Sequence, residues 1–279
     1  MDQDLCLVWL YCVIDGVLRS IGRARQRGPA PALTDAEVLT IQVWGEIRGL
    51  PNDASVWRDA ATSLRGWFPT LCNEWNFVRR CGSLAKVMDL IVALLFAPTK
   101  DWNAFDGLPL PVCRNIRAAR DRRFGGEAAW SFCAAKNERY YGFKAGMLMN
   151  SCGEIYRLWL GPANVDEREM LHGIVFDMPG LLFADKGLIS PELVLALAER
   201  DTDLVTPFRR NMPDMRPQWV VAQAMRLRRL IETAFSRLTD GFSVARTKGR
   251  DFWRWSARVL PKVLAYNLLM RFERCAAGI

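Results

Sequence analysis

The sequence has few residues that could hold zinc. It contains one histidine, His172, and its eight cysteines include no C-x-x-C pair. Zinc sites need Cys and His ligands at close, characteristic spacings, so this pattern argues against one. Small buried thiols in a reducing compartment are the better interpretation of the cysteines.

Long apolar runs and a positively charged secretion signal are also lacking. The longest apolar runs, Leu90–Ala97 and the Leu5–Leu18 stretch that Asp15 interrupts, fall short of the roughly 20 residues that a membrane-spanning helix needs. The opening residues Met1–Asp4 are acidic, whereas a signal peptide begins with positive charge. We therefore expect a cytoplasmic protein.

Several motifs of common enzyme classes are missing. There is no G-x-G-x-x-G, no Walker loop and no H-E-x-x-H, and no G-x-S-x-G turn exists to pair with His172. These absences argue against dinucleotide binding, P-loop phosphate binding, zinc proteolysis and serine hydrolase chemistry. We expect His172 to be a helix-surface or packing residue.

Positive charge is present in excess and is unevenly distributed. The net charge is +8, yet the segment from Arg209 to Lys262 holds 13 Lys and Arg against four acids, so the rest sums to about −1. A second basic cluster consists of Arg114, Arg117, Arg120, Arg122 and Arg123. Localised positive charge favours a polyanionic partner. A merely solvated basic face remains the alternative.

The first hundred residues are expected to be all helical. Thr34 and Glu37 form a capping box, and Asn73 is placed to cap another helix. The expected helices are Leu5–Arg19, a helix from the capping box to about Arg48, Ser55–Leu64, Glu74–Cys81 and Ser83–Phe96. The last two resemble a helix-turn-helix with Arg79, Arg80 and Lys86 toward DNA, although a plain helical bundle is equally compatible.

After Pro98 the pattern changes to strands mixed with helices. Strands are expected at Phe105–Val112, Ala128–Ala135, Tyr140–Asn150, Ile155–Leu160, Leu181–Ala184 and Asp203–Pro207. Helices are expected at Asp166–Phe176, Ser190–Arg200, Gln218–Leu238 and Phe252–Glu273, with a loop at Arg209–Pro217. This order predicts an α/β layer on a mixed sheet flanked by helices. The predicted domains are therefore 1–100, helical, and 101–279, α/β.

Three acidic residues are candidates for one site. Asp106 lies where a short strand is expected to give way to a turn, and Asp185 follows the apolar run Leu181–Ala184. Glu232 lies in an arginine-rich helix, four residues after Arg228. Three carboxylates from two strands and a helix would suit Mg²⁺ and phosphodiester chemistry. Taken alone, Arg228 and Glu232 are equally an ordinary i,i+4 ion pair.

Taken together, the residues resemble the bacterial insertion-sequence transposases of the DDE type, and most of all insertion-sequence family nine-eight-two. The matching stretches are Leu33–Val38, Asp106–Cys113, Gly126–Ala129, Tyr140–Lys144, Pro162–Arg168, Asp185–Ser190, Thr206–Met212, Arg229–Thr233 and Arg250–Trp253. They span nearly the whole chain in order. The resemblance implies an RNase H-like catalytic core after an all-helical N-terminal domain that binds DNA.

The resemblance also implies the chemistry. Asp106, Asp185 and Glu232 would be the metal-binding triad, holding two Mg²⁺ ions for which Mn²⁺ substitutes. The enzyme would cleave the element's ends and join them to target DNA. Its partners would be double-stranded DNA, as terminal inverted repeats and as target, and a second copy of the chain on paired ends. The location implied is the bacterial nucleoid.

The chain departs from the related transposases around the glutamate. They carry a Tyr-Arg-Glu-Lys signature, of which Arg228 matches the arginine. Met225 stands at the tyrosine position and Thr239 at the lysine position. Lys248 is a candidate for the missing cation.

Further residues are candidates for contacts with DNA or with the site. Phosphate contacts are expected from Arg114, Arg117, Arg120, Arg122, Arg123, Lys136, Lys144, Arg226, Arg228 and Arg229. Asn164 and Asp166 are candidates for orienting the site, and Glu167 for starting a helix. Trp253 or Trp255 would stack on a displaced base, unless it packs in the core.

Two other functions are compatible with the same residues. A metal-dependent nuclease would use the same triad but never join strands. A DNA-binding repressor would bind without cleaving, although the three intact acids argue against it. A strand-transfer assay separates these alternatives.

Overall fold

The computed structural model describes residues 2–22, 30–134, 136–175, 178, 180–207 and 217–278. The loop expected at Arg209–Pro217 lies outside the described residues except for Pro217, and so does much of the matching stretch Thr206–Met212. The chain divides into two compact units. The helical unit contains residues 1–95, 240–249 and 253–279, and the sheet unit contains residues 96–239 and 250–252. The C-terminal segment thus joins the helical unit, whereas the sequence placed it with the sheet.

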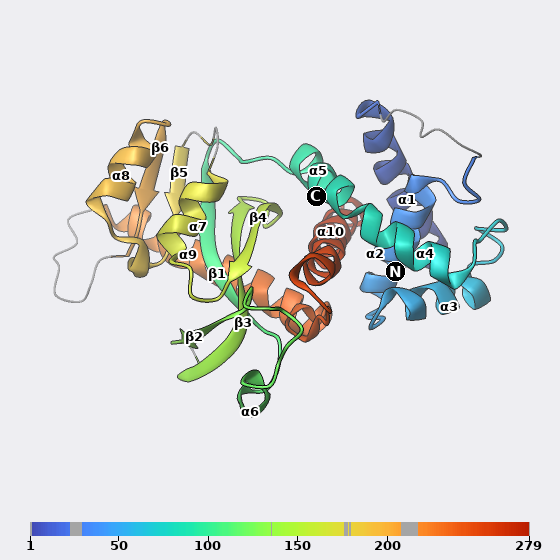
Figure 1. Ribbon diagram of the computed structural model, residues 1–279. Helices are drawn as coiled ribbons and strands as arrows, with labels where there is room; N and C mark the ends of the chain where they lie inside the picture. Colours follow the sequence, from blue (N-terminus) through green and yellow to red (C-terminus); the bar gives the residue numbers. More distant parts are fainter. Residues whose placement is uncertain are drawn as a thin grey trace. The chain divides into compact units, whose positions relative to one another are not determined.

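The helical unit is built from six helices in the described part of the chain (Figure 1). They are α1 (Gln3–Ser20), α2 (Asp35–Ile47), α3 (Asp53–Ser63), α4 (Glu74–Ser83), α5 (Ala85–Leu95) and α10 (Phe252–Ala276). The expected capping box is present, since the Glu37 amide donates to the Thr34 hydroxyl and the Thr34 amide to the Glu37 carboxylate. Asn73 caps α4 as expected. These local signals fix where the helices start.

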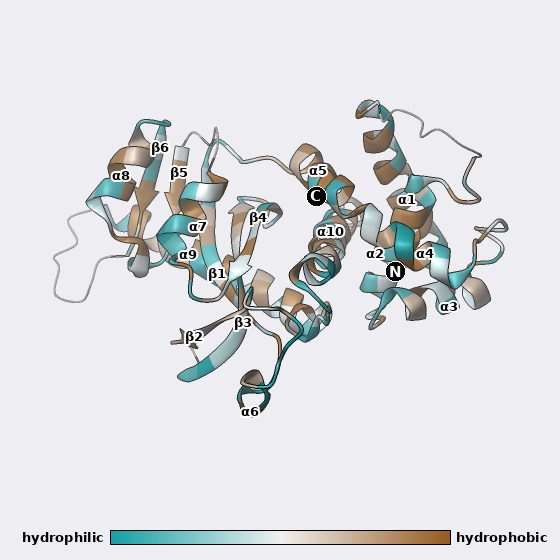
Figure 2. Ribbon diagram, viewed as in Figure 1, coloured by the Kyte–Doolittle hydropathy of each residue, from teal (hydrophilic) through white to brown (hydrophobic). Residues whose placement is uncertain are grey.

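Helices α1 and α5 carry broad apolar faces (Figure 2). Their inward residues, including Leu7, Leu10 and Ile91, are almost completely buried. No helix within the described ranges is long and apolar enough to cross a membrane. The buried residues of α1 and α5 belong to the core of the unit.

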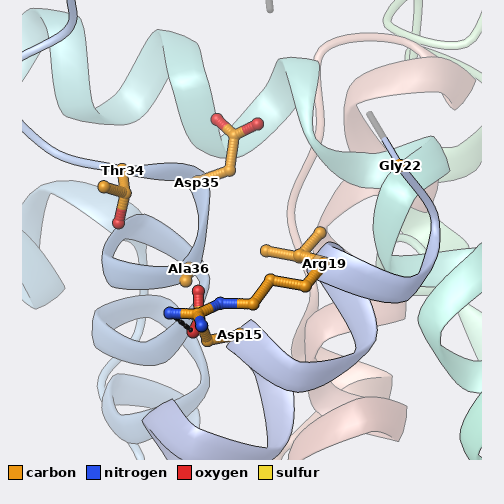
Figure 3. A pocket seen from close by; sticks show the side chains of 7 residues that line it. Asp15, Arg19, Gly22, Thr34, Asp35 and Ala36 are labelled. Atoms are coloured by element: carbon orange, nitrogen blue, oxygen red, sulfur yellow. Dashed lines mark ion pairs between the residues drawn. The ribbon is translucent and has the colours of Figure 1, made fainter. Parts of the chain in front are cut away.

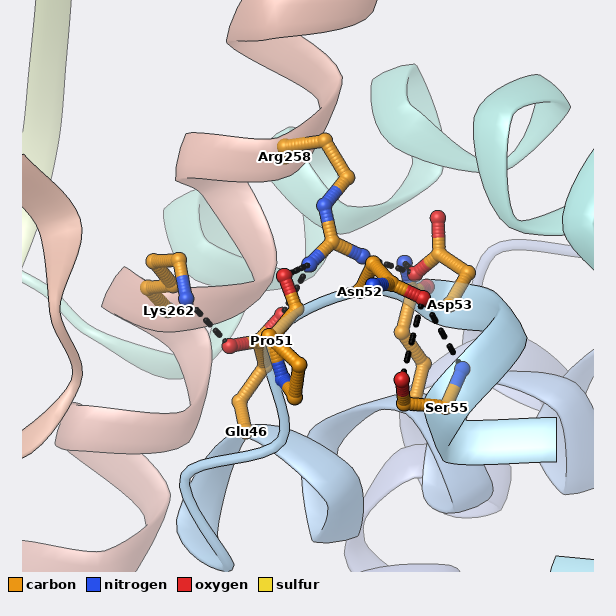
Figure 4. A network of polar contacts seen from close by, with 8 residues as sticks. Glu46, Pro51, Asn52, Asp53, Ser55, Arg258 and Lys262 are labelled. Carbon is orange, nitrogen blue, oxygen red and sulfur yellow. Dashed lines mark hydrogen bonds and ion pairs between the residues drawn. The ribbon is translucent and has the colours of Figure 1, made fainter. Parts of the chain in front are cut away.

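A buried charge network joins α10 to the other helices of this unit (Figure 4). Lys262 Nζ lies 2.5 Å from Glu46 Oε2, and Arg258 Nη2 lies 3.4 Å from Glu46 Oε1. Arg258 also pairs with Asp53, the first residue of α3, and the Gln42 amide donates to Asp53 over 3.0 Å. Two cations of α10 thus meet two acids of α2 and α3, which explains why the C-terminal helix belongs here.

The sheet unit contains a mixed six-stranded sheet. Its strands are β1 (Trp102–Pro111), β2 (Ala129–Cys133), β3 (Glu138–Asn150), β4 (Ile155–Pro162), β5 (Gly180–Phe183) and β6 (Thr202–Val205). Strand β3 pairs antiparallel with β1, β2 and β4. Strands β1, β5 and β6 run parallel to one another, in that order. The expected mixed sheet flanked by helices and the preceding helical region are confirmed.

Helices of the sheet unit lie against the sheet (Figure 1). Helix α7 (Glu167–Ile174) packs on β1, β3 and β4, and α9 (Gln218–Ser236) packs on β1 and β5. Helix α8 (Pro191–Ala198) packs on β6 and starts at the expected Ser190 cap with Pro191 following. The short α6 (Asn115–Ala118) follows β1. Helices α7 and α9 are therefore the two that approach the central strand.

The expectation that a turn follows Asp106 is wrong, because Asp106 lies in the middle of β1. Its register partner in β3 is Met147, and the pairing continues to Pro111 opposite Gly142. The Val112 amide donates to the Tyr141 carbonyl of β3, so the even positions of β1 bond to β3. The backbone nitrogens of the odd positions, which include Pro109 and Pro111, face away from β3. On that side, β5 pairs with β1 only as far as Ala104. No described strand there requires a hydrogen bond from positions 109 and 111, so proline's missing N–H has no cost.

Candidate active site

Asp106 and Asp185 occupy corresponding positions on two adjacent parallel strands, β1 and β5, with Asp185 just past the end of β5. Ala104 of β1 is the register partner of Phe183 of β5, and each acid follows two residues later. Asp185 lies just past the end of β5, at the start of the single turn Lys186–Leu188. Both side chains are half-buried. Functional groups of open α/β sheets gather at this carboxyl edge of the parallel strands.

Glu232 reaches the site region from α9. Leu227, Ile231 and Ala234 are buried and fix the side of α9 that packs on β1 and β5. Arg228 and Glu232 flank this buried stripe, with Arg228 Nε 2.9 Å from Glu232 Oε1. Both side chains are more than half exposed, so this ion pair contributes little to stability.

Electrostatic interactions connect Asp106 with Asp185, and connect Arg228 with both aspartates and with Glu232. Burial is the main reason that the pKa of Asp106 is raised to about 7, and the charges of Glu167 and Asp185 raise it further. The Gly107 amide, which donates to Asp106 over 2.7 Å, and the Arg228 charge act in the opposite direction. The pKa of Arg228 is raised by its bond to Glu232 and by the charges of Asp185 and Asp106.

The residues of this site fit a hard divalent cation by their chemistry. The buried carboxylate of Asp106 has the negative charges of Glu167 and Asp185 acting on it, so a cation beside it would be favourable. Carboxylate oxygens are the ligands that Mg²⁺ prefers. Glu232 is turned to Arg228, and within the described residues no three His, Cys, Asp or Glu side chains are close enough to hold one ion together. Because the Arg228–Glu232 pair is exposed, exchanging Arg228 for another cation costs little.

Helix α7 brings two further residues to this edge of the sheet. Glu167 is the first residue of α7, and Arg168 donates to the Gly187 and Ile189 carbonyls over 3.2 and 3.4 Å. Arg168 therefore ties α7 to the turn that follows Asp185. Sequence reasoning missed both residues. It assigned Glu167 only to the start of a helix, and the run Pro162–Arg168 contains no signal that identifies the strand on which α7 lies.

Asn164 and Asp166 lie just before α7. The Asp166 carboxylate accepts the Arg168 amide over 2.8 Å and so caps the helix. Asn164 is exposed. Lys144 of β3 is half-buried, with Nζ 3.4 Å from the Val165 carbonyl and 3.5 Å from Glu167 Oε1. Lys144 thus faces this acidic edge of the sheet.

Most of the expected DNA contacts are exposed side chains of the sheet unit. The exposed ones are Arg114, Arg117, Arg120, Arg122, Arg123, Lys136, Arg226, Arg228 and Arg229. Arg123 donates from Nε to Asp121 over 2.9 Å, so its charge is partly compensated. Lys248 is exposed and belongs to the helical unit.

The three cations of the expected helix-turn-helix, Arg79, Arg80 and Lys86, are engaged within the helical unit. Arg80 pairs with Asp35 at 2.6 Å and donates to the Leu33 carbonyl. Arg79 lies over the ring of Trp75, 5.0 Å from its centroid. Lys86 lies over Trp253, 5.5 Å from the centroid, and Trp253 itself is 63% exposed. Trp255 is buried, so only Trp253 remains available for stacking.

A hollow of about 310 Å³ on the helical unit offers no second site (Figure 3). It is lined by Asp15, Leu18, Arg19, Gly22, Thr34, Asp35 and Ala36. Asp15 pairs with Arg19 at 2.8 Å, and Asp35 pairs with Arg80. The charges around the hollow are therefore already neutralised.

Comparison with known proteins gives the following matches. A family model described as a transposase DDE domain matches residues 98–252, a segment that contains Asp106, Asp185 and Glu232. No curated protein matches the chain. Among solved structures, the cryo-EM structure of a piggyBac transposase synaptic complex with hairpin DNA matches with a TM-score of 0.48 and 12% sequence identity. That match covers 98% of this chain and 75% of the other.

Proposed function

The chain belongs to the transposase DDE domain family, and from this premise we propose that it cleaves the ends of an insertion element and joins them to target DNA. Asp106, Asp185 and Glu232 are the acidic residues of this reaction. The order of motifs along the chain supports membership of insertion-sequence family nine-eight-two and a bacterial origin. The partners proposed are terminal inverted repeats and target DNA, bound by a homodimer at the nucleoid.

One observation carries the proposal. Asp106 and Asp185 come level on adjacent parallel strands, and both act electrostatically on Arg228, which is bonded to Glu232. Acids 79 and 47 positions apart in the sequence thus interact with the same arginine. A purely structural ion pair between Arg228 and Glu232 would not require two more acids beside it.

Asp106, Asp185 and Glu232 are the residues that would hold divalent cations. Two Mg²⁺ ions, or Mn²⁺ in their place, would supply Lewis acidity that activates the attacking hydroxyl and stabilises the leaving oxygen. Asp106 would hold a cation from the central strand, where burial raises the pKa of its carboxyl. Asn164 and Asp166 border α7 and orient this edge of the sheet.

The exposed cations bind the DNA backbone. Arg228 exchanges Glu232 for a phosphate, which releases the Glu232 carboxylate for the site. Arg226 and Arg229 lie beside Arg228 on the exposed side of α9, and the Arg114–Arg123 cluster and Lys136 extend the basic surface. Binding through phosphates makes the affinity fall steeply with salt.

The test is cleavage and joining of a labelled duplex that carries the element's own end, in Mg²⁺ and in Mn²⁺. Wild type is compared with Asp185→Asn and with Asp203→Asn, an exposed aspartate of β6 that serves as the matched control. We expect nicking and joining by wild type and Asp203→Asn, and loss of both in Asp185→Asn while DNA binding persists.

Other outcomes point to the two alternatives. Cleavage without joining, also lost in Asp185→Asn, identifies a nuclease. Tight binding by all three proteins without cleavage in either metal rejects the enzyme and leaves a DNA-binding repressor.

A further inference from the structure

We infer that Glu167 is a fourth carboxylate of the site, a positioning residue that strengthens the binding of a divalent cation at Asp106. This inference rests on the proposed function, because it needs Asp106 to hold a cation. It assigns Glu167 a role beyond the start of α7. The argument comes from the surface of the sheet beneath that helix.

Two glycines make a bare patch under α7. Gly107 of β1 and Gly146 of β3 are register partners, so they lie side by side on one face of the sheet. A methyl group added at Gly107 would lie 2.7 Å from Oε1 of Glu167, and one added at Gly146 would lie 2.8 Å from Cε of Met170. Glu167 and Met170 are three residues apart and share one side of α7. Because neither glycine has a side chain, this side of α7 can lie directly against the sheet.

The carboxylate of Glu167 is directed onto the sheet. A glutamate in the first turn of a helix is favourable wherever its side chain points, because it faces the positive end of the helix. Here the carboxylate instead rests on Gly107, the residue after Asp106, and its Oε1 lies 3.5 Å from Lys144 Nζ. Helix stability alone does not require either contact.

The charge of Glu167 acts on Asp106 more strongly than that of Asp185 does. Lys144 compensates part of this charge from the side of β3. A carboxylate whose charge acts on a desolvated acid adds to the attraction for a cation without having to be its ligand. Residues that act on a metal site in this way typically change metal affinity by about 10–100-fold when they are replaced.

The first measurement is Mn²⁺ binding by the full chain, followed by the electron paramagnetic resonance signal of free Mn²⁺. We expect Glu167→Gln to weaken binding by about tenfold or more. The matched control is Glu169→Gln, an exposed acid on the same helix, which should bind as wild type does. Equal affinities of the two variants overturn the inference. Circular dichroism and thermal melts establish that each variant is folded.

A second variant displaces the carboxylate without changing any charge. In Gly107→Ala the three atoms nearest the added methyl group belong to the flexible end of Glu167 and the stem of Lys144, so the fold should persist. We expect Gly107→Ala to weaken Mn²⁺ binding, and the double variant with Glu167→Gln to bind no worse than Glu167→Gln alone. Losses that add in full mean that the methyl group acts on Asp106 directly, and they contradict the inference.

Lys144→Met separates the inferred role from a merely structural one. If Glu167 only anchored Lys144, removing either partner would change Mn²⁺ binding in the same direction. We expect opposite directions, with tighter binding in Lys144→Met because Glu167 loses its compensating cation.

Asp106→Asn tests the premise. If it abolishes binding while Glu167→Gln does not weaken it, only the inference fails, whereas a wild type that binds no Mn²⁺ overturns the proposed function as well.

Discussion

At the scale of single residues, Asp106 has the most unusual environment among the described acids. Its carboxylate accepts a hydrogen bond from the Gly107 amide, and the charges of Glu167 and Asp185 act on it against that of Arg228. A carboxylate in such surroundings is kept at the expense of stability. This expense is the expected mark of a residue retained for its chemistry.

The raised pKa of Asp106 predicts how stability depends on pH. In the unfolded chain this carboxyl ionises near pH 4, whereas in the folded chain it ionises near pH 7. Ionisation therefore favours unfolding increasingly as the pH rises from about 4 to about 7, and the penalty stays constant above that range. Asp106→Asn removes the penalty, so it should be more stable than wild type at pH 8 by on the order of a few kcal/mol.

The measurement is the melting temperature of both proteins from pH 5 to pH 8 in EDTA. The advantage of Asp106→Asn should shrink as the pH falls. An offset that is the same at every pH would contradict the raised pKa. Added Mg²⁺ should stabilise the wild type and leave Asp106→Asn unaffected.

At the scale of elements, α2 and α3 approach so closely that Gly45 is required between them. A methyl group at Gly45 would lie 2.7 Å from Cγ1 of Val56 and closer still to Cγ2. Gly45→Ala should therefore cost about 1–3 kcal/mol of unfolding free energy, as overpacking of a core does. Adding Val56→Ala should relieve the clash, so the double variant should lose less than the two single losses together.

Urea unfolding of the full chain measures these differences. Gly16→Ala in α1 is the control, because no atom lies within 4 Å of the added methyl group. It should be neutral, or stabilising by up to about 1 kcal/mol through helix propensity. A Gly45→Ala variant as stable as Gly16→Ala would show that the two helices can move apart freely.

Features fixed by neighbouring residues were predictable from the sequence. The capping box of Thr34 and Glu37 and the Ser190 cap need only a few consecutive residues, and both are present. The turn expected after Asp106 was wrong, whereas the strand expected at Phe105–Val112 is largely present within β1, where Gly107 and Pro109 pair with β3. Local propensity carries no information about such a partner strand.

Features fixed by distant contacts were not predictable. The position of Glu167 depends on the register that sets Gly107 opposite Gly146. The basic surplus between Arg209 and Lys262 includes Arg258 and Lys262, which the sequence analysis counted as charge available to DNA. Both are bonded to acids of the helical unit instead. Only tertiary structure separates a compensated cation from an exposed one.

At the scale of the whole molecule, the chain returns to its first unit at the end. Lys262 is 5% exposed and its partner Glu46 is fully buried, so neither can recruit water as a substitute. Burial raises the pKa of Glu46, while Lys262 and Arg258 oppose this shift. Losing one member of such a group leaves an uncompensated buried charge.

Lys262→Met should therefore destabilise the protein by about 3–5 kcal/mol. The double variant Glu46→Gln/Lys262→Met should recover part of that loss, because no charge is then left without a partner at this position. Removing the exposed pair partner in Arg19→Met, whose side chain is 79% exposed, should cost less than about 1 kcal/mol. Urea unfolding of the three variants checks the order. A Lys262→Met variant no weaker than Arg19→Met would refute the importance of this network.

The return of α10 to the helical unit has a consequence for biosynthesis. When the ribosome has made the first hundred residues, the acids Glu46 and Asp53 exist, but the cations that compensate them are still to be translated. Most of the sheet unit, residues 96–239, is made before α10. A nascent chain that ends before α10 therefore lacks the cations that compensate Glu46 and Asp53, and its helical unit becomes stable only once α10 has been made.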